Sequence, residues 1–246
     1  MPLPDFLVIG AMKCGTSTLQ EQLAAQEGVF MSTPKEPCFF SDDARYARGL
    51  AWYESLFAQA APSDLKGEAS THYTKLPTYP HCVDRLAATL PQAKLIYMVR
   101  DPFERMVSHY IHEWTMGVVR CGIEEAVERY PEMVAYSRYA MQIRPYVDKF
   151  GPECIHVLSL EALKTDPQGA LAQIGAFLGA PRPFRWRDDL DPANASAERI
   201  RRFPLQKLVF GNPVSDVIRR TLVPKALREA VKNRLRMRER PVLSDA

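Results

Sequence analysis

The chain has 246 residues, of which 46% are hydrophobic and 25% are charged, and its formal net charge is +3. This is an ordinary globular composition, long enough for one large α/β core but short for two full domains. So small a net charge does not by itself indicate a nucleic-acid-binding protein, and we expect no nucleic-acid partner.

Cysteines and apolar runs bear on the compartment. The five cysteines are scattered without C-x-x-C pairing, which indicates neither a zinc site nor a disulfide framework. The first residues show no basic region followed by a long apolar one, and no apolar run approaches the ~18 residues of a membrane span. We therefore expect a cytoplasmic protein with reduced thiols, no signal peptide and no membrane span.

Strands and helices alternate along the chain. Continuous apolar runs predict buried strands over residues 6–9, 29–31, 94–99 and 154–158, and residues 65–70 are predicted to be the end of a strand that enters a loop. Apolar residues at helical spacing predict helices over residues 17–26, 50–57, 82–89, 102–114, 122–129, 137–150 and 170–178. This alternation predicts a three-layer α/β fold of the P-loop type, in which a central, mainly parallel sheet is flanked by helices.

We predict a single domain over residues 1–246. Its core covers about residues 5–180, and an irregular segment rich in proline and glycine, with a basic C-terminal tail, covers about residues 181–246. In the tail, residues 217–240 carry nine Lys/Arg against two Glu, which suits either contact with an anion or a solvated helical face.

The first strand leads into a phosphate-binding pattern. Its apolar run ends at Gly10, a loop with Lys13 and Gly15 follows, and hydroxyl residues at 16–18 open the helix. A strand, a glycine-bearing loop and a helix N-terminus together bind an anion, because backbone N–H groups and the helix dipole point at it. In a Walker A loop the lysine directly follows the second glycine, whereas Lys13 stands two residues before Gly15.

The clearest buried strand, at residues 94–99, ends at Arg100. Asp101 and Pro102 then give a strong helix start, with aspartate as N-cap and proline at the first helical position. Arg100 stands where a kinase of the P-loop class could hold Mg²⁺ with an acid. This favours a metal-free anionic substrate over ATP-Mg²⁺.

Two motifs carry a resemblance to a known family. Lys13-Cys-Gly-Thr-Ser-Thr18 and Arg100-Asp-Pro-Phe-Glu-Arg-Met-Val-Ser108 resemble the nucleotide signatures of sulfotransferases that use 3′-phosphoadenosine 5′-phosphosulfate (PAPS). The segment Pro34-Lys-Glu-Pro-Cys-Phe-Phe40 resembles the acceptor-side loop of the heparan-sulfate branch and its bacterial relatives, and Gly67-Glu-Ala-Ser70 and Gln173-Ile-Gly-Ala-Phe-Leu-Gly179 also fit that branch. Two motifs in the right order and at the right distance are a specific signal, and the resemblance covers about residues 5–180.

The resemblance implies a role for each nucleotide motif. Lys13 would contact the oxygen between phosphorus and sulfur, where negative charge grows as the bond breaks. Arg100 and Ser108 would hold the 3′-phosphate, since a guanidinium fork suits phosphate oxygens. The residues that would cradle the 5′-phosphosulfate are Lys13, Cys14, Gly15, Thr16, Ser17 and Thr18.

On the acceptor side, Glu36 matches the family's general base. It would take the proton from an acceptor hydroxyl or amine as that atom attacks sulfur. His72 is the alternative base, because histidine titrates near neutral pH. We also expect Lys35 and Tyr73 to contact the acceptor.

The sequence departs from the animal enzymes of this branch at two places. Those enzymes usually have a lysine after Gly67-Glu68, where this chain has Ala69, and they clasp the nucleotide with a cysteine-bridged hairpin near the C-terminus. Here the corresponding residues are 194–202, where Ser196, Arg199 or Arg201 would contact the nucleotide. The acceptor preference of the animal enzymes therefore does not carry over.

We predict a PAPS-dependent sulfotransferase that needs no metal ion. It moves a sulfuryl group to a hydroxyl or amine of a carbohydrate or small natural product, by in-line transfer with Glu36 as base and Lys13 stabilising the leaving phosphate. Two alternatives stay open, namely a P-loop nucleoside-triphosphate kinase and a catalytically silent module that binds a nucleotide or polyanion. The oligomeric state is not predicted.

Overall fold

The computed structural model describes residues 3–190, 237 and 240–243. The chain forms two compact units, one of Met1–Arg105 with Glu132–Asn194 and one of Met106–Pro131 with Ala195–Ala246. The single domain over residues 1–246 stays a prediction. Its irregular segment has neither helix nor strand over residues 181–190, and the rest of that segment and nearly all of the basic tail lie outside the described residues.

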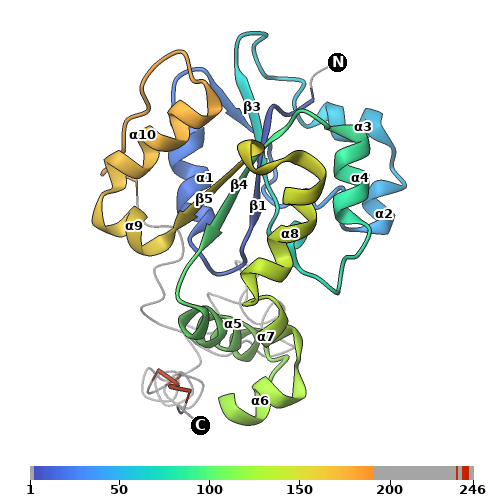
Figure 1. The fold of residues 1–246 in the computed structure, drawn as a ribbon, viewed down its shortest axis with the longest axis vertical. Coiled ribbons are helices and arrows are strands. Elements are labelled where there is room, and N and C mark those ends of the chain that lie inside the picture. Colours follow the sequence, from blue (N-terminus) through green and yellow to red (C-terminus); the bar gives the residue numbers. More distant parts are fainter. Residues whose placement is uncertain (1–2, 191–236, 238–239, 244–246) are drawn as a thin grey trace, which may run out of the picture. The chain divides into compact units, whose positions relative to one another are not determined.

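The first unit contains a parallel sheet in the order β2-β3-β1-β4-β5 (Figure 1). Its described strands are β1 Phe6–Gly10, β2 Val29–Met31, β3 Leu65–Ala69, β4 Lys94–Val99 and β5 Ile155–Ser159. The central strand β1 is buried along its whole length, and its Val8 lies opposite Ala69 on one side and Ile96 on the other. All four strand pairs are parallel, which confirms the predicted parallel sheet. The apolar sequence of β1 fits a strand that is covered on both faces.

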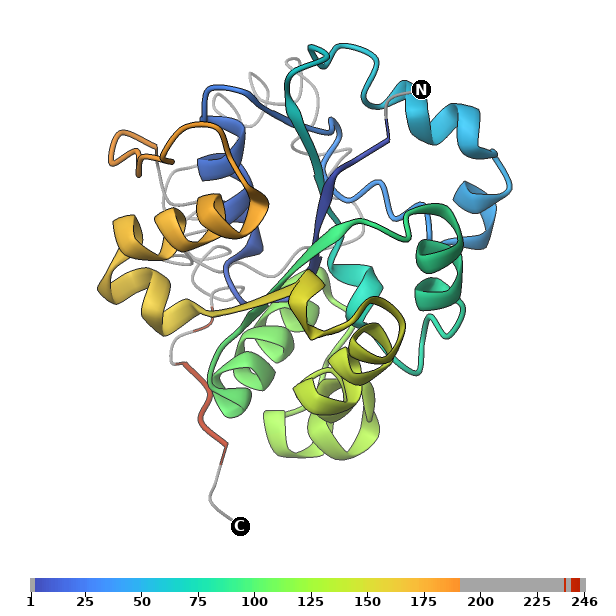
Figure 2. The same ribbon diagram turned by 45° about the horizontal axis from the view of Figure 1, so that its top comes forward.

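Helices cover both faces of this sheet. Figures 1 and 2 show α1, α9 and α10 on one face and α3, α4 and α8 on the other, which confirms the predicted three-layer arrangement. The described helices are α1 Thr16–Ala24, α2 Asp43–Tyr46, α3 Leu50–Ser55, α4 Cys82–Thr89, α5 Pro102–Met116, α6 Ile123–Arg129, α7 Glu132–Ala135, α8 Tyr139–Phe150, α9 Leu160–Thr165 and α10 Pro167–Leu178. The short 3₁₀ helices are η1 Thr71–Thr74 and η2 Pro152–Cys154.

Capping residues set several of these helix boundaries. The Asp101 carboxylate accepts a hydrogen bond from Glu104 N at 2.8 Å, and α5 begins at Pro102 as predicted. By contrast, α10 begins at Pro167, three residues before the predicted start. There the Asp166 carboxylate accepts from Gly169 N at 2.8 Å and supplies the cap that apolar spacing does not show.

Three glutamine side chains hold the extended segment at residues 184–187. Gln22 on α1 and Gln26, two residues beyond its end, bond the backbone N–H and C=O groups of Arg187 and Arg185, respectively, at 2.8–2.9 Å. Gln168 on α10 bonds the two remaining residues of the segment, at 2.9 Å. These amides replace the partners that a sheet would provide, so the segment is ordered without being a strand.

The second unit is described over Met106–Pro131. It contains the C-terminal part of α5 and the whole of α6. The Tyr110 hydroxyl donates to the Cys121 carbonyl oxygen at 2.9 Å and so ties α5 to the connection that leads into α6.

Candidate functional site

Four of the predicted site residues follow the carboxyl ends of four neighbouring strands. Lys13 follows β1, Glu36 follows β2, His72 follows β3 and Arg100 follows β4. Because these strands are parallel, their carboxyl ends meet at one edge of the sheet, where open α/β proteins bind their ligands.

Glycines shape the loop between β1 and α1. Gly15 is the N-cap of α1 with φ +87°, and a Cβ atom there would lie 2.7 Å from Leu160 Cδ1. Gly10 has φ +146°, and its Cβ would lie 1.9 Å from Thr74 Oγ1. No side chain caps the N-terminus of α1. The loop therefore requires glycine at both positions, and its helix end suits an anion.

Arg100 contacts this loop from the end of β4. Its Nη1 donates to the Lys13 carbonyl oxygen at 3.4 Å, and its Nη2 donates to Glu104 at 2.9 Å. Its Nε is buried without a hydrogen-bond partner among the described residues. A buried donor without a partner is costly, so this guanidinium fits a site where a phosphate oxygen supplies the acceptor.

Cys14 lies inside the loop with a fully buried side chain. Its Sγ is 3.6 Å from the Tyr139 hydroxyl. Burial is the main cause that raises the pKa of its thiol to about 11, so the thiol is neutral at physiological pH. The Cys14 side chain packs the loop against α8, which leaves only its backbone for ligand binding.

Lys35 links the loop to the predicted base. Its ammonium donates to Ser17 Oγ at 2.8 Å and lies 3.5 Å from Glu36 Oε1. The structure thus brings the sequence-predicted Lys35 and Glu36 to the N-terminal turn of α1.

Thr71 orients the Glu36 carboxylate. Its backbone N–H donates to Glu36 Oε2 at 2.9 Å, and its hydroxyl lies 3.2 and 3.3 Å from the two carboxylate oxygens. Glu36 itself has φ +57°. Sequence reasoning missed Thr71, although a hydroxyl residue directly after a strand that ends at this edge was a usable signal.

His72 and Tyr73 differ from their predicted roles. His72 stacks on Tyr79 at 4.8 Å, and burial, helped by the Lys75 charge, lowers its pKa to about 4. It is therefore neutral at pH 7 and a weaker base than an ordinary histidine. Tyr73 is only 1% exposed and packs in the core against Phe40, so we no longer count it among the acceptor contacts.

The remaining predicted residues belong to other parts of the chain. Ser108 lies on α5 in the second unit. Ser196, Arg199 and Arg201 lie outside the described residues.

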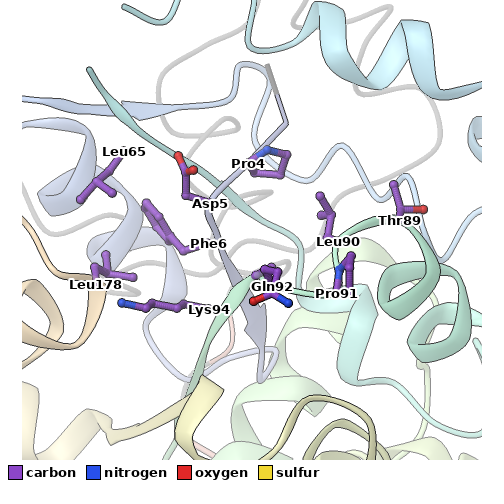
Figure 3. Close-up of a pocket in the computed structure, with 11 residues that line it drawn as sticks. Pro4, Asp5, Phe6, Leu65, Thr89, Leu90, Pro91, Gln92, Lys94 and Leu178 are labelled. Carbon is purple, nitrogen blue, oxygen red and sulfur yellow. The ribbon is translucent and has the colours of Figure 1, made fainter. Parts of the chain in front are cut away.

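A cavity of about 440 Å³ lies elsewhere, at the amino ends of β1, β3 and β4 (Figure 3). Its charged side chains are already engaged, because Lys94 donates to the Phe177 carbonyl oxygen at 2.7 Å and Asp5 pairs with Lys66 at 3.2 Å. None of the predicted site residues lines it. We therefore place the candidate site at the opposite, carboxyl edge of the sheet.

The described residues contain no group of three or more His, Cys, Asp or Glu placed to hold a metal ion. Among their helices, none is both long and apolar enough to cross a membrane.

The chain is similar in sequence to known proteins. A family model described as "Sulfotransferase domain" matches residues 3–235. Heparan sulfate glucosamine 3-O-sulfotransferase 3B1 of Mus musculus is 31% identical over 192 residues, which are 73% of this chain and 47% of that protein. Membrane-associated sulfotransferase kil1 of Dictyostelium discoideum is 39% identical over 111 residues, 44% of this chain and 22% of that protein. The chain thus spans about half or less of the curated relatives it matches.

A solved structure supports the fold along most of the chain. The sulfotransferase from Alicyclobacillus acidocaldarius has 27% sequence identity and a TM-score of 0.66, and the match covers 78% of this chain and 88% of that one. The sulfotransferase domain from the curacin biosynthetic pathway, at 21% identity and a TM-score of 0.54, shares the fold.

Proposed function

Because this chain belongs to the sulfotransferase family, we propose that it transfers a sulfuryl group from PAPS to a hydroxyl or amine of a carbohydrate or small natural product. The observation that carries the proposal is the double contact of Lys35. One ammonium group touches both Ser17, in the phosphate-binding turn, and the Glu36 carboxylate. An anion cradle and a proton acceptor therefore lie side by side, as transfer from an anionic donor to a protonated acceptor requires.

The cradle residues would hold the donor. Bound PAPS supplies an activated sulfuryl group, whose departure leaves negative charge on the phosphate oxygen. The backbone of residues 13–18 and the N-terminus of α1 would bind the 5′-phosphate, and the Lys13 ammonium would stabilise the growing charge. Arg100 would bind the 3′-phosphate, and its Nε, which has no hydrogen-bond partner among the described residues, supports this assignment.

Glu36 would accept the proton of the attacking hydroxyl or amine. The Thr71 N–H and hydroxyl hold its carboxylate in place, and the Lys35 ammonium keeps positive charge beside it. Glu36 is a better candidate than His72, because Thr71 and Lys35 hold its carboxylate beside the cradle, whereas the His72 ring is stacked on Tyr79.

We further propose a cytoplasmic enzyme that works without a metal ion. Arg100 supplies positive charge where an ATP-Mg²⁺ site would need an acid to hold the metal. The saccharide named in the heparan-sulfate relatives supports a carbohydrate acceptor, and the buried Ala69 at the position of their lysine makes a different saccharide the better candidate.

The test is transfer of labelled sulfate from PAPS to a panel of glucosamine saccharides, phenols and polyols. Glu36→Gln should keep its affinity for adenosine 3′,5′-bisphosphate and lose turnover by about 10²–10⁴-fold, the usual contribution of a general base. Glu153→Gln, at an exposed acid on η2, is the matched control. Phosphoryl transfer from ATP-Mg²⁺ without sulfuryl transfer would establish the kinase alternative, and normal turnover of Glu36→Gln would move the base to His72.

A further inference from the structure

Glu68 is a fully buried acid that the proposed mechanism does not use. It lies in β3, immediately before Ala69, and its exposed fraction is 0%. Neither carboxyl oxygen has a hydrogen-bond partner among the described residues. An ionised carboxylate in such a place is strongly unfavourable, so the group avoids the charge by keeping its proton.

The groups that face Glu68 come from four neighbouring parts of the chain and include no cation. Tyr53 on α3 and Tyr73 on η1 have buried hydroxyls that act on the Glu68 carboxyl group and lower its pKa. Glu36 adds a negative charge, and the Cys82 thiol on α4 and the Cys38 thiol also interact with Glu68. Burial is the largest cause that raises the pKa of Glu68 to about 8. The Glu36 charge raises it too, and the two tyrosine hydroxyls oppose the rise only in part.

The two tyrosines form the floor of the loop that carries Glu36. Tyr53 stacks on Phe39 with ring centroids 4.5 Å apart and meets Phe40 edge-on at 5.2 Å. Tyr73 packs on Phe40 at 5.7 Å. Phe39 and Phe40 belong to the same loop as Glu36, so whatever moves the tyrosines also moves the base.

The strand end beyond Glu68 holds the same loop by hydrogen bonds. The Ala69 carbonyl oxygen accepts from Glu36 N, and Ser70 Oγ accepts from Cys38 N, both at 3.0 Å. Glu36 and Cys38 have φ of +57° and +52°, a region that non-glycine residues rarely adopt, so the loop keeps its shape only while these contacts persist. Glu68 thus lies where the supports of the loop converge.

We propose that Glu68 is a positioning residue that must carry its proton for the Glu36 loop to keep its active shape, so that ionisation of Glu68 sets the alkaline limit of activity. Loss of the proton to hydroxide would leave a second carboxylate behind Glu36, whose own cation is Lys35 at 3.5 Å, with no cation among the described groups that shift the pKa of Glu68 itself. The aromatic floor would then have to open to let water reach the charge. The activity part of this inference rests on the proposed function.

The same ionisation has a defined effect on stability. The pKa of Glu68 is raised in the folded chain, so folding favours the protonated form. The ordinary pKa of a glutamate is 4.5, and that of Glu68 in the folded chain is about 8. The free energy of unfolding therefore falls as the pH rises from 4.5 to about 8, and the loss due to Glu68 is constant above that pH. A neutral side chain of the same shape should remove this dependence.

Glu68→Gln is the decisive variant, because an amide has the shape of the protonated acid at every pH. Parent activity should fall about tenfold by pH 9, the loss expected for one ionisation at a pKa near 8, whereas Glu68→Gln should stay within about twofold of its pH 7 activity. The difference between its melting temperature and that of the parent should grow in favour of the variant between pH 5 and pH 8, and should stay constant above pH 8. Glu54→Gln, at a buried acid on α3, is the matched control and should follow the parent.

Two further measurements do not need transfer activity, so they separate this proposal from the proposed function. Carbon-13 NMR of labelled glutamate carboxyls should show one group that titrates near pH 8 and disappears in Glu68→Gln. Tyr73→Phe, which removes a hydroxyl that lowers the pKa of Glu68, should move that titration to higher pH. The proposal is overturned if no carboxyl titrates above pH 6, if folded Glu68→Gln is inactive at pH 7, or if it shares the alkaline loss of the parent.

Discussion

The cradle loop at residues 10–18 and the base loop at residues 32–40 lie at the same edge of the sheet but are held in different ways. Neighbours in the sequence shape the cradle loop, through glycines at its two ends and the start of α1. Distant side chains shape the base loop, where Thr71 binds the carboxylate and Arg45 donates to the carbonyl oxygens of Glu36 and Pro37.

This difference separates what a motif carries from what a fold supplies. The cradle can be recognised wherever its spacing recurs, because glycine and a helix N-terminus are sufficient to bind an anion. The base loop depends on the end of β3, on α2 and on a buried acid, none of which a short motif contains. Substitutions in the cradle should therefore act on donor binding and charge, whereas substitutions around the base loop should act on orientation and pH dependence.

Among Lys13→Ala, Arg100→Ala and Thr71→Val, we expect Lys13→Ala to have the largest effect on activity. Removing a group aimed at developing charge lowers turnover by about 10²–10³-fold. The measurement is single-turnover transfer at saturating PAPS, and Lys164→Ala, at an exposed lysine on α9, is the control. A loss of less than about tenfold would mean that the loop backbone alone stabilises the leaving phosphate.

Arg100→Ala should act mainly on nucleotide binding. Charge-assisted hydrogen bonds contribute about 1.5–3 kcal/mol, so affinity for adenosine 3′,5′-bisphosphate should fall roughly 10–100-fold. Calorimetry measures it directly, with Arg144→Ala on the exposed face of α8 as control. If Arg100→Ala binds the bisphosphate as tightly as the parent, the assignment of the 3′-phosphate to Arg100 is wrong.

The fold was largely predictable because most of its strands are predominantly apolar runs, although β3 contains Lys66 and Glu68. Each described strand matches a predicted one to within a residue at either end. The four-residue helices α2 and α7 were not predicted, since so short a helix has no periodicity to detect. The α2 helix depends on Asp42, whose carboxylate accepts from Arg45 N at 3.0 Å.

Site residues could be predicted where their position after a strand identifies them, and could not be predicted where their role depends on how distant side chains pack. Lys13, Arg100 and Glu36 each follow a strand at the expected edge. Tyr73 could not be placed from sequence, because an aromatic residue near a motif packs in the core as readily as it lines a cleft. Glu68 was part of a recognised motif, but its complete burial emerges only when Tyr53 and Tyr73, from two other elements, are packed against it.

Thr71→Val gives the finest test of how the base loop works. The substitution removes the hydroxyl at 3.2 and 3.3 Å from the Glu36 oxygens but keeps the backbone N–H at 2.9 Å. A hydrogen bond to a charged group contributes about 1.5–3 kcal/mol, and the remaining N–H retains part of that, so turnover should fall roughly 3–10-fold at unchanged nucleotide affinity. Thr89→Val, where a hydroxyl bonds a carbonyl oxygen within α4, controls for the change in polarity. A loss as large as that of Glu36→Gln would show that orientation limits the base, whereas no loss would show that the backbone of the strand end orients it alone.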